Sequence, residues 1–128
     1  MSALQLAGAL GATGVTIGAF GAHYLKQTLV ARGTLESFKT GVQYQLIHAV
    51  AILALHGAAS NKGKGTATSA AAAAAAAASS AARWWAVGVL LFSGSIYGLS
   101  LGGPRILGPV TPLGGICMIV GWATLLMQ

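Results

Sequence analysis

Residues 4–24 restrict the fold of this chain more than any other stretch, because they carry no charged side chain over a length that can cross a bilayer. At about 100° per residue in a helix, five small residues of this stretch fall within an arc of roughly 80°. They are Ala7, Gly11, Gly14, Gly18 and Gly21. In water each interior glycine costs about 1 kcal/mol relative to alanine, whereas in lipid small residues let two helix backbones approach closely. The stretch therefore predicts a membrane-spanning helix that packs on a neighbour through its glycine face.

The rest of the chain has the composition of a membrane protein. Of its 128 residues, 55% are hydrophobic and only 6% are charged, far below the roughly 25% charge of soluble domains. At about 20 residues per crossing, the chain holds four spans at most. We expect an all-α integral membrane bundle, a single domain over residues 1–128, with spans at residues 4–24, 41–58, 84–101 and 112–127.

Two of the later spans carry patterns that predict helix packing. On the second span, Tyr44, Gln45 and His48 share one side of a helix with apolar residues, so we expect these polar groups in the bundle interior, where partners can satisfy them. On the third span, glycines recur at four-residue intervals and predict a second small-residue packing face. These glycines are Gly94, Gly98 and Gly102.

The connecting segments differ in character. Residues 32–40 contain the one acidic side chain, Glu36, and predict a short helix near the lipid headgroups. Residues 60–82 include an unbroken alanine run at positions 70–78 and predict a low-complexity linker. The 7 lysine and arginine residues lie singly at the edges of apolar segments, where they contact headgroups, including anionic ones. Because no aromatic-basic interleaving accompanies them, we expect lipid contacts and no nucleic-acid binding.

Few side chains in this sequence offer chemistry. His23, His48 and His56 are the only candidates for metal or haem ligands, and closely packed helices leave no room for a macrocycle. We expect histidines hydrogen-bonded in the bundle or at its surface, and no metal or cofactor. Proton or ion transport typically uses carboxylates inside the membrane, and the spans contain none. The serines also lack a nearby base-and-carboxylate arrangement for hydrolysis, so we expect no catalytic residue and no enzymatic activity.

Several short strings, in this order along the chain, resemble the small YgdD-like membrane protein family, which includes animal transmembrane protein 256. The strings are GAFGAH at 18–23, TGVQYQ at 40–45, FSGSIY at 92–97 and LGPVTPLGG at 107–115. The resemblance covers nearly the whole chain. It implies a four-helix membrane fold, found in bacterial inner membranes and in mitochondria, and it brings no catalytic residues. The alanine run departs from the family's usual compact connection.

The absence of intramembrane carboxylates and the small-residue faces lead to a structural hypothesis. We expect a non-catalytic accessory subunit of a larger membrane complex, with other membrane subunits as partners, in the mitochondrial inner membrane and in a respiratory complex such as complex I. A bacterial-type plasma membrane is the alternative location. A small transporter or channel and a free-standing lipid-organising protein are the alternative functions. Four spans also predict that both termini lie on one side of the membrane.

Overall fold

A computed structural model of the chain describes residues 1–62 and 68–127, and the described residues form helices and short connections only. Four helices are long: α1 (Ala3–Ala22), α3 (Leu35–Lys62), α4 (Ser69–Ser100) and α5 (Val110–Leu126). Two short elements, α2 (Lys26–Ala31) and the 3₁₀ helix η1 (Arg105–Leu107), lie in the connections. Four segments are long and apolar enough to cross a membrane, which confirms the predicted all-α, four-span fold.

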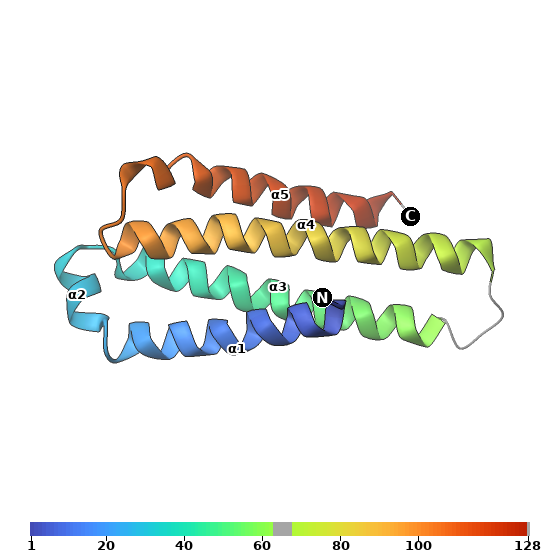
Figure 1. The fold of residues 1–128 in the computed structure, drawn as a ribbon, viewed down its shortest axis with the longest axis horizontal. Helices are drawn as coiled ribbons and strands as arrows, with labels where there is room; N and C mark the ends of the chain where they lie inside the picture. Colours follow the sequence, from blue (N-terminus) through green and yellow to red (C-terminus); the bar gives the residue numbers. More distant parts are fainter. Residues whose placement is uncertain (63–67, 128) are drawn as a thin grey trace.

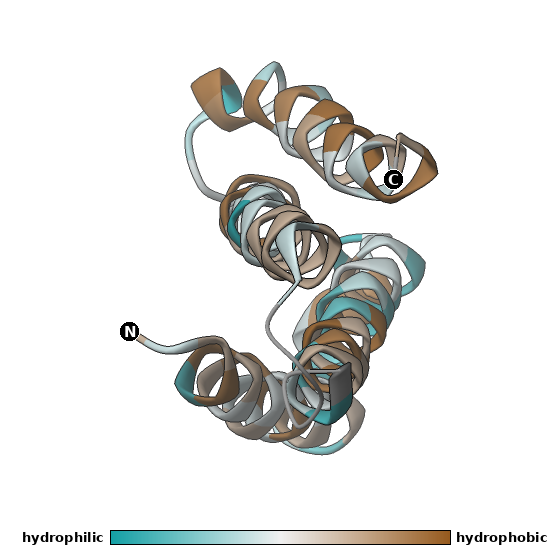
Figure 2. Cartoon of the chain, turned by 90° about the vertical axis from the view of Figure 1, so that its right-hand side faces the viewer, coloured by the Kyte–Doolittle hydropathy of each residue, from teal (hydrophilic) through white to brown (hydrophobic). Residues whose placement is uncertain are grey.

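The four long helices pack in the order α5, α4, α3, α1 (Figure 2). Helix α4 packs against α5 and α3, and α1 packs mainly against α3, so α3 and α4 are central and α1 and α5 are outer. The two termini lie toward the end of the bundle where α3 ends and α4 begins, and α2 and η1 lie at the opposite end (Figure 1). This arrangement agrees with termini on one side of the membrane.

The helix boundaries differ from the sequence prediction in three places. Residues 35–40 form the first turns of α3 and not a separate interfacial helix. The alanine run belongs to α4, where Thr68 caps the helix by accepting a hydrogen bond from the Ala71 amide over 3.1 Å. The high helix propensity of alanine and this cap extend α4 through most of the expected linker. Residues 63–67 of that linker lie outside the described residues, and the short helix α2 was not predicted.

Polar groups fix the ends of the helices. At the start of α1, Ser2 and Gln5 form a reciprocal capping box, with bonds of 3.1 and 2.9 Å. Helix α4 is followed by Gly102, whose φ of +90° suits glycine and which lies under the guanidinium of Arg32. The Thr34 hydroxyl donates to the Ser100 carbonyl over 2.9 Å. The connections at this end therefore hold the α2 region against the end of α4.

The hydrophobic core lies where α1, α3, α4 and α5 converge. Trp85 and Ile52 are among the largest fully buried side chains, and Val89, Met118 and Leu10 pack in the same cluster. Small residues of α1, α3 and α4 complete the cluster: Ala7, Ala49, Ala81 and Ala82. Many other large apolar side chains are exposed on the outside of the bundle, as expected for helices that face lipid.

Candidate functional site

The glycine face of α1 packs on α3 over three of its four predicted glycines. A Cβ atom placed on Gly14 would lie 2.7 Å from Leu46 Cδ2, and one on Gly18 would lie 3.1 Å from Val42 Cγ1. A Cβ on Gly21 would overlap the ring of Phe38. Gly11 differs, because no atom would lie within 4 Å of its Cβ. Close approach of α1 to α3 therefore depends on Gly14, Gly18 and Gly21, and not on Gly11.

The predicted glycines of α4 have three different environments. Gly98 is approached by Leu107 Cδ1, at 2.6 Å from an added Cβ, whereas no atom lies within 4 Å of that position at Gly94. Gly102 follows the helix and serves its termination, as its positive φ shows. The three glycines therefore do not form the one packing face that the sequence predicted.

Helix α4 also approaches α5 closely at Gly88, a residue that the prediction did not include. A Cβ on Gly88 would lie 2.9 Å from the backbone oxygen of Gly114, and one on Gly114 would overlap the backbone of Phe92. About two turns further along α5, an added Cβ on Gly121 would lie 2.5 Å from Trp85 Cδ1. The signal for Gly88 was weak in the sequence, because it stands alone among bulky residues and begins no glycine repeat.

A buried hydrogen-bond network runs from α4 through α3 to α1, as predicted for Gln45. The Tyr97 hydroxyl donates to Gln45 Oε1 over 2.7 Å. The Gln45 amide then donates to the Leu10 carbonyl over 2.9 Å and to the Thr13 hydroxyl over 2.8 Å, and Thr13 donates to the Ala9 carbonyl over 2.7 Å. Gln45 is only 4% exposed. Its amide therefore links three helices in an environment where an unsatisfied polar group is costly.

His48, also 4% exposed, links α3 to α5. The Trp122 indole N–H donates to His48 Nε2 over 3.1 Å, and His48 Nδ1 lies 2.7 Å from the Tyr44 carbonyl. Because an indole N–H only donates and a carbonyl only accepts, the neutral tautomer with its proton on Nδ1 satisfies both contacts. Both ring nitrogens are thus occupied by groups of the protein itself, an arrangement for packing and not for binding a metal.

Aromatic rings surround His48. The rings of Trp85 and Trp122 lie 4.4 Å apart between centroids, and His48 lies 5.9 and 6.0 Å from them. Tyr44 differs from its prediction as an interior residue, because its side chain is 41% exposed and its ring covers Phe92 at a centroid distance of 4.9 Å. Tyr44 therefore closes the outside of the cluster, while its backbone carbonyl supports His48.

The side chains that meet inside the bundle are neutral hydrogen-bonding groups. The series of hydrogen bonds from Tyr97 through Gln45 and Thr13 ends at backbone carbonyls. His23 caps the end of α1, and His56 lies beside Ala3 at the other end of that helix, so the three histidines occupy separate places. Among residues 1–62 and 68–127, no group of three or more potential metal-ligating side chains occurs. Ser93 adds a bond of 2.7 Å from its hydroxyl to the Gly41 carbonyl. These contacts fix the register of four helices.

Comparison with known proteins assigns the chain to a family. A family profile described as a protein of unknown function, DUF423, matches residues 17–115, from the second half of α1 into the start of α5. The chain belongs to the DUF423 family. This confirms the resemblance to the YgdD-like proteins. The DUF423 segment contains Gln45, His48, Ser93 and Tyr97, whereas Gly11 and Trp122 lie outside it.

Relatives of this DUF423 protein occur in bacteria and in yeast, and their names describe membrane proteins. It is 36% identical to the UPF0382 inner membrane protein YgdD of Escherichia coli K12 over 88% of this chain and 77% of YgdD. It is 34% identical to the UPF0382 membrane protein C1782.12c of Schizosaccharomyces pombe over 99% of this chain and 100% of the relative. YwdK of Bacillus subtilis is 37% identical over 84% of this chain and 79% of its own length. No solved structure matches the chain.

Proposed function

We propose that this DUF423 protein is a non-catalytic structural subunit of a larger membrane protein complex. The observation that carries the proposal is an open face on α1, made of Leu4, Gly8, Gly11 and Val15. At about 100° per residue these four residues fall within an arc of about 60°. Added Cβ atoms on Gly8 and Gly11 would meet nothing within 4 Å, and the side chains of Leu4 and Val15 are 53% and 63% exposed.

This face has the features of a helix-docking surface. Two glycines form a shallow hollow between two bulky side chains, so a helix from another protein could approach the α1 backbone closely. The same helix already uses Gly14, Gly18 and Gly21 in this way against α3. An interior whose hydrogen-bonding side chains are all neutral also supports a packing role, because proton and ion pathways typically use intramembrane carboxylates.

We also propose a cellular location for this protein. We place it in the mitochondrial inner membrane, within a respiratory complex such as complex I, and keep a bacterial-type plasma membrane as the alternative. A relative that matches over its full length in a yeast supports a eukaryotic setting. The E. coli relative, named an inner membrane protein, supports an energy-transducing membrane.

Native electrophoresis of membranes in mild detergent, followed by mass spectrometry of the bands, tests this function. We expect the wild-type protein to migrate in a large assembly and the Gly11→Leu variant to migrate as a small species, because leucine fills the hollow. Gly57→Leu is the matched control, since Gly57 is also open but lies near the end of α3. Migration of the wild type only as a small species would overturn the proposal and favour a transporter or a lipid-organising protein.

A further inference from the structure

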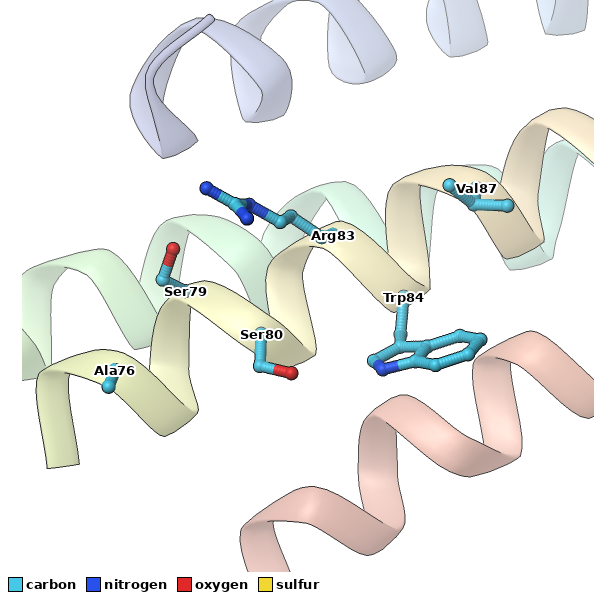
Figure 3. Close-up of a pocket in the computed structure, with 6 residues that line it drawn as sticks. All are labelled: Ala76, Ser79, Ser80, Arg83, Trp84 and Val87. Atoms are coloured by element: carbon cyan, nitrogen blue, oxygen red, sulfur yellow. The ribbon is translucent and has the colours of Figure 1, made fainter. Parts of the chain in front are cut away.

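The surface of α4 between α1 and α5 forms a groove, which we call the α4 groove. It has a volume of about 540 Å³ and is lined by Ala76, Ser79, Ser80, Arg83, Trp84 and Val87. Figure 3 shows that Arg83 and Ser79 point toward α1, whereas Ser80 and Trp84 point toward α5. The groove therefore carries a cation and hydroxyls at its floor and flanks, with a helix on either side.

No side chain in the described part of the chain compensates the charge of Arg83. Within residues 1–62 and 68–127, Arg83 takes part in no hydrogen bond or ion pair of the structure. The one acidic side chain of the sequence, Glu36, pairs with Lys39 over 3.2 Å near the start of α3, at the opposite end of the bundle. The groove thus presents positive charge and hydroxyl donors to an anion that comes from outside the chain.

Arg83 also lies at a defined depth along the bundle. Ala3, the first residue of α1, lines a pocket together with Ala78, Ser79 and Ala82 of α4. Arg83 is therefore level with the beginning of α1, where the membrane-crossing part of that helix starts. Arginine beside tryptophan is typical of the boundary between headgroups and hydrocarbon. An anion bound to Arg83 would therefore lie at the level of the lipid headgroups.

Beyond Arg83 the exposed face of α4 becomes apolar for the depth of one leaflet. Val87, Leu90 and Gly94 follow Arg83 on the same side of the helix, within an arc of about 60° at 100° per residue. Val87 and Leu90 are 47% and 67% exposed, and no atom lies within 4 Å of a Cβ on Gly94. From Arg83 to Gly94 the helix rises about 16 Å, close to half of a hydrocarbon core of about 30 Å.

We propose that the α4 groove binds one phospholipid, with its phosphate at Arg83 and Ser79 and an acyl chain along Val87, Leu90 and Gly94. Only a molecule with an anionic head and an apolar tail one leaflet long matches both the charge and the length of this face. A transmembrane helix from a partner would match the apolar part but would leave Arg83 without an anion. An anionic phospholipid binds more tightly than a zwitterionic one, because its net charge adds to the attraction of the phosphate. This lipid site on α4 is independent of the open face of α1.

Native mass spectrometry of the full chain in mild detergent tests this site. The protein is incubated with equal amounts of phosphatidylglycerol and phosphatidylcholine that carry the same acyl chains. We expect one bound lipid, mainly phosphatidylglycerol, in the wild type and at least a tenfold lower bound fraction in Arg83→Gln. Arg105→Gln, which removes a cation at the other end of the bundle, should keep the bound lipid.

Two further measurements distinguish a lipid site from a site for a small free anion. Val87→Trp fills the apolar part of the groove and should lower binding of both lipids while Arg83 is intact, and thermal unfolding checks that each variant is folded. Inorganic phosphate at millimolar concentration should not displace the lipid. Equal lipid binding in Arg83→Gln and Arg105→Gln, unchanged binding in Val87→Trp, or full displacement by phosphate would each overturn the proposal.

Discussion

Trp122 donates its indole N–H to Nε2 of His48 over 3.1 Å, and this hydrogen bond joins α5 directly to α3. The main packing partner of α5 is α4, and α3 packs on α1 and α4. The bond therefore connects two helices that are not neighbours in the packing order of Figure 2. It limits how far α5 can rotate around α4, because the rotation would leave Nε2 of the buried His48 without its partner.

We expect Trp122→Phe to lower the free energy of unfolding by about 1 kcal/mol, since phenylalanine keeps an aromatic ring but has no donor for His48. Trp84→Phe is the matched control, because Trp84 is exposed to a similar degree, 40% against 45% for Trp122, and makes no hydrogen bond among the described residues. Unfolding in mixed micelles followed by near-ultraviolet circular dichroism measures both variants. Equal losses in the two variants would show that the bond to His48 contributes nothing specific.

Gln45 holds three helices together, so its loss should be more costly. In Gln45→Leu the Tyr97 hydroxyl loses its acceptor and the Leu10 carbonyl loses one of its donors, and we expect a destabilisation of about 1–3 kcal/mol. Gln43→Leu makes the same chemical change at an exposed position two residues away. The same unfolding measurement compares them. A Gln45→Leu variant as stable as Gln43→Leu would contradict a stabilising role for the network.

The contact of α4 with α5 tolerates no side chain at Gly88. Even a methyl group there would lie 2.9 Å from the backbone oxygen of Gly114, so Gly88→Ala should push α5 outward and destabilise the bundle by about 1–3 kcal/mol. Gly94→Ala, six residues along the same helix, adds a methyl group in open space and should leave stability unchanged or slightly improved. An unchanged stability of Gly88→Ala would mean that α4 and α5 can move apart without destabilising the bundle.

Two glycines of α1 should respond differently to leucine. Gly14→Leu places a branched side chain against Leu46 and should lower stability or expression strongly, because α1 must move away from α3. Gly11→Leu should fold as well as wild type, since its side chain enters open space. Expression level and thermal unfolding in detergent measure this. Equal folding of both variants would show that close approach at Gly14 is incidental.

The arrangement of the helices predicts which positions share a membrane side. In a Cys117→Ser background, Ser2→Cys and Leu126→Cys should react with a membrane-impermeant thiol reagent from the same side, and Arg105→Cys from the opposite side. Sealed vesicles of known orientation provide the measurement. Labelling of positions 2 and 126 from opposite sides would contradict four spans.

The sequence predicted the fold because long uncharged segments leave a chain few choices in lipid. It also predicted Gln45 and His48 as interior groups, since a polar residue on an otherwise apolar span must find a partner inside the protein. Side-chain periodicity predicted Tyr44 beside them, and its ring does stack on His48 at a centroid distance of 6.2 Å, but on the outer side of the cluster, where 41% of the residue stays exposed.

The partners across the bundle could not be derived from the sequence. Which glycine meets another helix depends on the crossing points, and these follow from the depth and rotation of each helix and not from glycine spacing. Gly88 meets Gly114, while Gly94, in a regular repeat, meets nothing. Trp122 likewise could not be assigned to His48, because 74 residues and two changes of chain direction separate them.

The length of α4 has a consequence for how the protein meets its surroundings. Its 32 residues rise about 48 Å, well beyond a hydrocarbon core of about 30 Å, so the turns before Arg83 project from the membrane. There the alanine run lies against Leu55, Ala58 and Ala59 of α3. Two turns, about seven residues, added to or removed from both helices in this projection would change its height by about 10 Å and keep the same faces of α3 and α4 together. The contacts between Arg83 and Ser100 would stay in register. The start of α4 is thus a helical extension outside the bilayer, and its length does not depend on the packing within the bilayer.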